Sequence, residues 1–242
     1  MGRHGTIAGR KESQDNKRAQ IFTKFARAIT VAAKSGGDPS YNMTLKHAID
    51  KAKGINMPND NITRAIKKGT GELAGETYEE NNFEGYGPGG VAVIVEVLTD
   101  NRNRSTAAIK HAFDKYGGNL GAIGCVTYMF ERKGYILIEK TDSVDEDKLM
   151  DVALEAGMDD MISREDSFEI LTSTEAFIQV EEALKQAGFE LLESDIELIP
   201  SLEATPTDEY DIKNLKKMIA ILEENDDVQK VHHNCTFDLE EE

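Results

Sequence analysis

Apolar residues follow two different spacings along this 242-residue chain, and the change between them limits the folds that it can adopt. Up to about residue 70 they recur every three or four positions, as at Ile21, Phe25 and Ile29, which predicts helices with one buried face. From Val91 onward, β-branched runs alternate with helical segments. The sequence therefore predicts a helical region that is followed by mixed α and β structure.

The helical region divides into three helices, because a glycine stands where each of them should end. A stretch rich in Gly and Glu, over about 71–82, has no clear period and predicts a linker. Together these segments predict a small all-α domain over residues 1–78. Its predicted helices cover about residues 15–34, 45–54 and 58–69.

The rest of the chain predicts two α+β domains, one inserted into the other. Two strands, over about 91–98 and 126–130, and the helix between them form too small a sheet to be stable alone. A βαββαβ set that follows is typical of a ferredoxin-like domain, and the last helix and strand supply the missing parts of the first sheet. A linear series of domains would instead leave two half-sheets with unpaired edges. The predicted α+β multidomain fold comprises a helical domain (1–78), a discontinuous middle domain (79–133 plus 204–242) and an inserted ferredoxin-like domain (134–203).

Charge is distributed very unevenly along the chain. Residues 1–71 contain 14 Lys and Arg against 5 Asp and Glu, a net charge of +9, whereas the remainder contains 14 basic and 40 acidic residues, a net charge of −26. Phosphate polymers are attracted by the first segment and repelled by the second, so we expect nucleic acid to bind at the helical end. The alternative for the acidic part is that its charge serves only solubility.

Basic residues of the helical region are the candidate nucleic-acid-binding residues. In the first helix, cations recur at intervals of seven, three and seven, which predicts a row on one exposed side, and others lie in the Gly-rich segment before it. The alternative is an ordinary solvated helix face. Phe22 and Phe25 are assigned to the core rather than to base stacking. The predicted binding residues are Arg3, Arg10, Lys11, Lys17, Arg18, Lys24, Arg27 and Lys34.

A secondary anion contact is predicted at Arg102 and Arg104, which join a strand to the start of a helix. The alternative is a polar turn whose Asn and Ser side chains cap that helix.

Catalytic and metal-binding motifs are absent, so we predict no enzymatic activity, no cofactor and no metal site. The Gly85–Gly90 loop precedes a strand and lacks Lys, which favours a tight turn over a phosphate-binding loop. His232 and His233 would face opposite sides of a strand. Cys125 and Cys235 lack zinc or disulfide spacing, and no leader or membrane-spanning stretch is seen, so we expect a cytoplasmic protein without a membrane partner.

Several long motifs resemble those of the YebC family, in order along essentially the whole chain. One departure is at the start, where the commonest opening of the family has Ser-Lys-Trp and this chain, which has no Trp, begins Gly2-Arg3-His4. The matching motifs are Asp15–Lys24, Asn56–Lys68, Glu84–Glu96, Leu98–Arg104 and Phe130–Gly134.

The resemblance implies a three-domain cytoplasmic protein that acts in gene expression. Family members are generally assigned as DNA-binding transcriptional regulators, and others act in translation at the ribosome, where they are proposed to relieve stalling at proline-rich stretches. We therefore expect a DNA-binding regulator, with a ribosome-associated, RNA-binding translation factor as the alternative. Its partners would be DNA, or ribosomal RNA together with basic ribosomal proteins, and a monomer is favoured because no dimer seam is evident.

Overall fold

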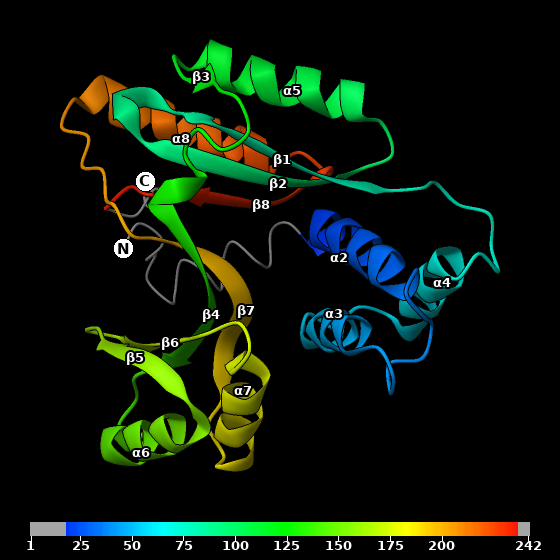
Figure 1. Ribbon diagram of the computed structural model, residues 1–242, viewed down its shortest axis with the longest axis vertical. Helices are drawn as coiled ribbons and strands as arrows, with labels where there is room; N and C mark the ends of the chain where they lie inside the picture. The colour runs from blue at the N-terminus through cyan, green and yellow to red at the C-terminus, as the bar shows by residue number, and fades with distance from the viewer. Residues whose placement is uncertain (1–17, 237–242) are drawn as a thin grey trace. The chain divides into compact units, whose positions relative to one another are not determined.

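The computed structural model describes residues 18–236 (Figure 1). Contacts divide this part of the chain into two compact units. One unit contains the residues up to Thr127 together with Thr205–His233, and the other contains Tyr128–Ala204 and the residues from Asn234. The chain therefore leaves the first unit at Thr127 and returns to it at Thr205.

The helical region consists of α2 (Arg18–Ala33), α3 (Met43–Gly54) and α4 (Asn59–Gly69), which pack against one another. Asn42 caps α3, because its side-chain oxygen accepts the N–H of Leu45 at 3.0 Å. The three helices surround one apolar core, to which the partly buried Phe22 and Phe25 also pack. Its buried members include Ile29, Ala33, Leu45, Ile49, Ala52, Ile62 and Ala65.

A four-stranded antiparallel sheet follows in the same unit, with the strand order β3-β1-β2-β8. Helices α5 (Arg102–Lys115) and α8 (Glu209–Glu223) contact each other and this sheet (Figure 1). Strand β8, which is far from the others in sequence, pairs with β2 and completes the sheet. The strands are β1 (Glu79–Tyr86), β2 (Ala92–Thr99), β3 (Asn119–Leu120) and β8 (Val228–His233).

Two local predictions in this unit were wrong. Strand β1 begins inside the stretch that was predicted as a linker, and the strand predicted over about 126–130 is replaced by a 3₁₀ turn (Thr127–Met129). The buried Glu84 explains the second difference, because its carboxylate accepts the N–H groups of Val126 and Thr127, both at 3.1 Å. Those two N–H groups are therefore not available to a sheet ladder.

The second unit has the predicted ferredoxin-like order of elements. Its antiparallel sheet has the strand order β5-β6-β4-β7, and α6 and α7 pack against the apolar face of that sheet. Buried residues such as Ile136, Leu149, Phe168 and Phe177 form its core. The elements are β4 (Phe130–Glu139), α6 (Glu146–Ala156), β5 (Met158–Ser163), β6 (Ser167–Thr172), α7 (Phe177–Gln186) and β7 (Leu191–Pro200). The predicted α+β fold class is confirmed.

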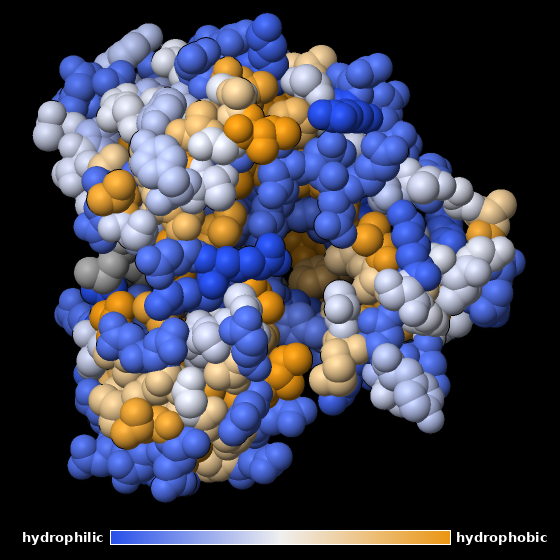
Figure 2. Space-filling model, viewed as in Figure 1, coloured by the Kyte–Doolittle hydropathy of each residue, from blue (hydrophilic) through white to orange (hydrophobic). Residues whose placement is uncertain are grey.

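The surface is largely polar on the face shown in Figure 2, with smaller apolar areas between hydrophilic residues. Exposed large apolar side chains in the described part of the chain include Tyr41, Ile123 and Leu154. Within residues 18–236, no helix combines the length and the apolar character that crossing a membrane requires.

Candidate nucleic-acid interface

Lys24, Arg27 and Lys34 of the predicted cation row all bind groups of the protein itself. The Nζ atom of Lys24 donates to the carbonyl oxygen of Glu223 at 2.8 Å, and that of Lys34 donates to the carbonyl of Tyr78 at 2.7 Å. Arg27 is the most deeply placed, with only 14% of its side chain exposed. The expectation that the whole row faces solvent is therefore wrong for Arg27, whereas Lys34 is exposed.

The other predicted binding residues lie at or before the start of α2. Arg3, Arg10, Lys11 and Lys17 lie outside the described residues, and Arg18 is described only as the first residue of α2.

A buried carboxylate, that of Asp227, accounts for the burial of Arg27. Asp227 lies just before β8, its side chain is 5% exposed, and its Oδ1 atom is 2.7 Å from Nη1 of Arg27. Its Oδ2 atom accepts from Nη2 of Arg104 at 2.8 Å, from Ser105 Oγ at 2.6 Å and from Thr99 Oγ1 at 3.2 Å. Burial alone would raise the pKa of Asp227, but the hydrogen bonds from Ser105, Arg104 and Arg27 outweigh it and lower that pKa.

The Asp227 cluster also includes Arg104, one of the two arginines of the predicted secondary anion contact. Arg104 is held by Asp227 and by Asp100, each at 2.8 Å, and these hydrogen bonds raise its pKa. Asn101 caps α5 by accepting the N–H of Arg104 at 3.1 Å, as in the polar-turn alternative. Arg102 is exposed in the first turn of α5, and its side chain makes no hydrogen bond or ion pair with another described residue. Of the two arginines, Arg102 is the one left for an external anion.

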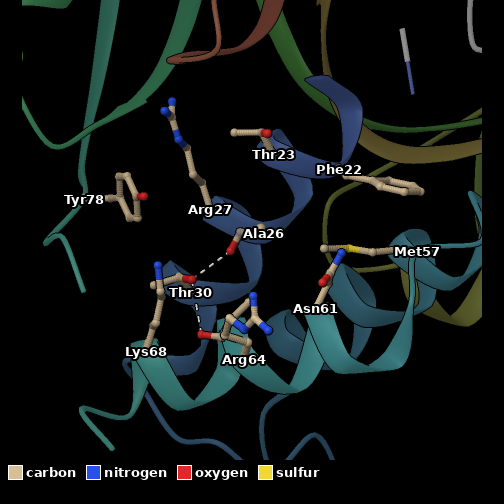
Figure 3. A pocket seen from close by; sticks show the side chains of 11 residues that line it. Phe22, Thr23, Ala26, Arg27, Thr30, Met57, Asn61, Arg64, Lys68 and Tyr78 are labelled. Atoms are coloured by element: carbon tan, nitrogen blue, oxygen red, sulfur yellow. Dashed lines mark hydrogen bonds between the residues drawn. The ribbon is translucent and has the colours of Figure 1, made fainter. Parts of the chain in front are cut away.

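A groove of about 280 Å³ between α2, α4 and the segment before β1 brings together further basic and aromatic side chains (Figure 3). Asp and Glu are absent from the described residues that line it. A phosphate group that enters this groove therefore meets cations without a competing lining carboxylate. The lining residues are Phe22, Thr23, Ala26, Arg27, Thr30, Met57, Asn61, Arg64, Ala65, Lys68 and Tyr78.

Two cations of α4 make the groove basic, and neither belongs to the predicted binding residues. Arg64 is exposed, and its side chain makes no hydrogen bond or ion pair with another described residue. Lys68 lies 3.9 Å from the Glu76 carboxylate, and both side chains remain partly exposed, so this ion pair is weak. The signal for them was present in the sequence, because Arg64, Lys67 and Lys68 follow one another along the last two turns of α4.

Aromatic rings stand on two sides of the groove (Figure 3). Phe22 packs against the helical core and also lines the groove beside Met57, so its assignment to the core alone was incomplete. The Tyr78 ring lies 5.4 Å from the guanidinium carbon of Arg27. Burial, assisted by the neighbouring Glu76 carboxylate, raises the pKa of the Tyr78 hydroxyl.

Two family models match the chain and together span most of it. Residues 3–72 match the TACO1/YebC protein N-terminal domain, and residues 78–235 match the TACO1/YebC second and third domain. The chain belongs to the TACO1/YebC family.

Relatives in this family match the chain over nearly its full length. A probable transcriptional regulatory protein of Clostridioides difficile (strain 630) is 56% identical over 97% of this chain and 98% of its own. One from Geobacter sulfurreducens is 51% identical over 98% and 95%. The crystal structure of a conserved hypothetical protein from Aquifex aeolicus has a TM-score of 0.84 and 45% identity, and the match covers 92% of both chains. The TACO1/YebC resemblance and the fold class are thus supported independently by sequence and by structure.

The remaining motifs of this TACO1/YebC chain form structural features. The glycine-rich loop closes a tight turn between β1 and β2, in which Gly89 and Gly90 have positive φ angles of 68° and 75°. His232 is buried in β8, with its Nε2 atom 3.5 Å from the Glu96 carboxylate. Within residues 18–236, His, Cys, Asp and Glu do not form a group of three that could hold a metal ion.

Proposed function

We propose that this protein is a nucleic-acid-binding regulator of gene expression whose helical region contacts the phosphate backbone. The observation that carries the proposal is the position of Arg64 and Lys67, which are exposed on one side of α4 and bind no other described residue through their side chains. Such cations release counterions from a nucleic acid when they neutralise its phosphates, which favours binding without any base contact.

The predicted binding residues enter this proposal in different ways. Lys34 is exposed and reaches solvent beside Tyr78, so it can contribute directly. Lys24 and Arg27 contribute through their contacts with residues 223–227, which hold α2 in place. The basic residues up to Arg18 remain proposed contacts, as does Arg102 at the start of α5.

Duplex DNA is the proposed target, because the relatives are named probable transcriptional regulatory proteins. Contacts with phosphates position a protein on DNA but carry no sequence information, so we propose backbone binding and no recognition of a specific operator. The acidic remainder of the chain repels the same polyanion, which limits binding to the helical end.

A charge-reversal variant on α4 tests the proposal directly. We expect Arg64→Glu with Lys67→Glu to weaken binding to a 20-base-pair DNA duplex by about tenfold or more at 50 mM salt, and to reduce the salt dependence. The measurement is fluorescence anisotropy of the labelled duplex between 50 and 200 mM salt. Lys213→Glu with Lys217→Glu is the matched control, because these exposed α8 lysines give the same change in net charge.

Four outcomes decide the proposal. An effect on the α4 variant alone supports the proposed interface, whereas equal losses in both variants would show that only net charge matters. If the wild-type protein binds neither the duplex nor an RNA hairpin at 50 mM salt, the proposal fails. Tighter binding to the hairpin would reassign the same interface to RNA, as the translation-factor alternative requires.

A further inference from the structure

The α2–α4 groove combines features that a phosphate backbone alone does not need. Arg64 and Lys68 extend from α4 into the groove, while Phe22 and Met57 form an apolar wall on one side (Figure 3). Its volume of about 280 Å³ lies just below the range for small-molecule sites, which begins at roughly 300 Å³. The groove therefore suits a small unit that has both an anionic and a flat apolar part.

We infer that this groove binds one nucleotide unit with an unstacked base, with the phosphate on Arg64 and Lys68 and the base against Phe22. The inference rests on the proposed function and adds to it the class of ligand. In a duplex the faces of the bases are covered by their neighbours, so only an unpaired or single-stranded nucleotide presents a base to an aromatic side chain.

The phosphate is expected to bind the cations of α4 rather than Arg27 of α2. Arg27 already shares the Asp227 carboxylate with Arg104, so its charge is largely satisfied within the protein. Arg64 has no such partner among the described residues, and the contact of Lys68 with Glu76 is long. The two α4 cations are one turn apart on the same helix, which allows both to reach one phosphate.

Asn61 supplies a group that can recognise the edge of a base. It lies one turn before Arg64 on α4, is half-buried and points into the groove (Figure 3). A side-chain amide both donates and accepts hydrogen bonds, so it can pair with the edge of any base without excluding the others. The site would therefore select unpaired bases over paired ones but would discriminate little among the four bases.

A pair of phenylalanines on α2 allows a matched test. Phe22 and Phe25 are both half-buried and both pack against the helical core, but only Phe22 belongs to the groove. Phe22→Leu keeps the apolar packing and removes the flat ring. We expect Phe22→Leu to weaken binding of a labelled 12-nucleotide single strand about tenfold and to leave binding of the 20-base-pair duplex unchanged.

The control variants separate stacking from folding. Phe25→Leu should leave the affinities for the single strand and for the duplex unchanged. Phe22→Tyr keeps the aromatic ring, so it should bind the single strand as the wild type does. The fluorescence of a 2-aminopurine base placed in the strand should be quenched when the strand binds the wild type, and it should not be quenched when the strand binds Phe22→Leu. Competition with adenosine monophosphate tests the source of the nucleotide, because displacement of the strand at micromolar concentration would support the groove and identify a free nucleotide as its ligand.

Two results would overturn the inference, and they differ from failure of the proposed function. Equal losses for Phe22→Leu and Phe25→Leu would reduce Phe22 to a packing residue. A single-strand affinity that does not change in Phe22→Leu, with duplex binding intact, would remove the nucleotide site and leave backbone binding in place. If the wild-type protein binds no nucleic acid at all, the proposed function and the nucleotide site both fail.

Discussion

Asp227 accepts hydrogen bonds from side chains in two parts of the sequence that are distant from its own. Arg27 belongs to α2, Arg104 and Ser105 belong to α5, and all three donate to this carboxylate just before β8. Arg27 also donates to the carbonyl oxygens of Leu98 and Asp226, so the end of β2 is included. The cluster therefore links the helical region to the first sheet by charge-assisted hydrogen bonds, which are the stronger kind.

Replacing Asp227 with Asn tests the importance of this cluster for stability. The variant keeps the shape of the side chain but removes the charge that two guanidinium groups share. Breaking a buried ion pair costs roughly 3–5 kcal/mol, and because Arg104 is half-exposed, we expect a loss of about 2–3 kcal/mol in the free energy of unfolding. Urea denaturation measures this, with Asp226→Asn as the control because Asp226 is exposed and contributes only its carbonyl oxygen. Equal stability of the two variants would contradict the role given to the cluster.

At the scale of elements, α2 and α4 cross closely enough to require a glycine. A Cβ atom on Gly69 would meet the carbonyl oxygen of Thr30 and would lie 2.6 Å from Cβ of Ala33. Thr30 also donates from Oγ1 to the carbonyl oxygen of Ala65 at 3.2 Å, which ties the same two helices together. This contact holds one wall of the groove against the other.

The Gly69 contact predicts a difference between two glycines that both end a helix. Gly69→Ala forces α2 and α4 apart, and overpacking of this kind costs about 1–3 kcal/mol of the free energy of unfolding. Gly54→Ala at the end of α3 meets no atom within 4 Å, so we expect no loss and a gain of up to about 1 kcal/mol. Urea denaturation of both variants checks the prediction, and a loss for Gly54→Ala as large as for Gly69→Ala would refute it.

At the scale of the whole molecule, charge is the dominant feature. The chain has a net charge of −17, yet its helical end is basic, so a polyanion and a polycation would approach different parts of the surface. Two buried carboxylates, Glu84 and Asp227, have lowered pKa values in the unit that carries the basic helices. For Glu84, burial would raise the pKa, but the N–H groups of Gly124, Val126 and Thr127 donate to it and lower the pKa below the ordinary 4.5.

These shifts determine how stability depends on pH. A carboxylate with a lowered pKa stabilises the folded state above its ordinary pKa, and this contribution is lost as the pH falls through the lower folded value. We expect Glu84→Gln to lower the free energy of unfolding by about 2 kcal/mol at pH 7, and the difference from wild type to shrink below pH 4.5. Urea denaturation from pH 7 to pH 3 measures it, with the exposed Glu80→Gln on the same strand as control. A difference that does not change with pH would contradict this origin.

Local patterns in the sequence predicted most of the elements, and their failures have physical causes. The stripe at Ile29 and the glycine at the end of α3 act within one or two turns, so the helices could be read directly. Strand β1 contains Asn81, Asn82 and Gly85, which have low strand propensity, and it is stabilised by pairing with β2 and β3 on its two sides. Such pairing is invisible to a pattern within the strand itself.

The sequence predicted that the candidate site is basic, but it did not predict which basic residues are exposed there. Counting residues along the chain located the basic end, because net charge is a property of the sequence alone. Which cations remain free depends on the partners that folding brings to them. Arg27 was chosen by its helical spacing and is buried against Asp227, whereas Arg64 was not chosen and is exposed.

The sequence by itself determined the class of most segments and the polarity of charge, since these follow from composition and from contacts within a few residues. The tertiary structure decided which cations are paired within the protein and where a groove forms. Those outcomes depend on residues such as Arg27 and Asp227, which are 200 positions apart in the chain and meet at 2.7 Å only when the helices pack on the sheet. Burial and pairing are properties of that packing, and no local pattern contains them.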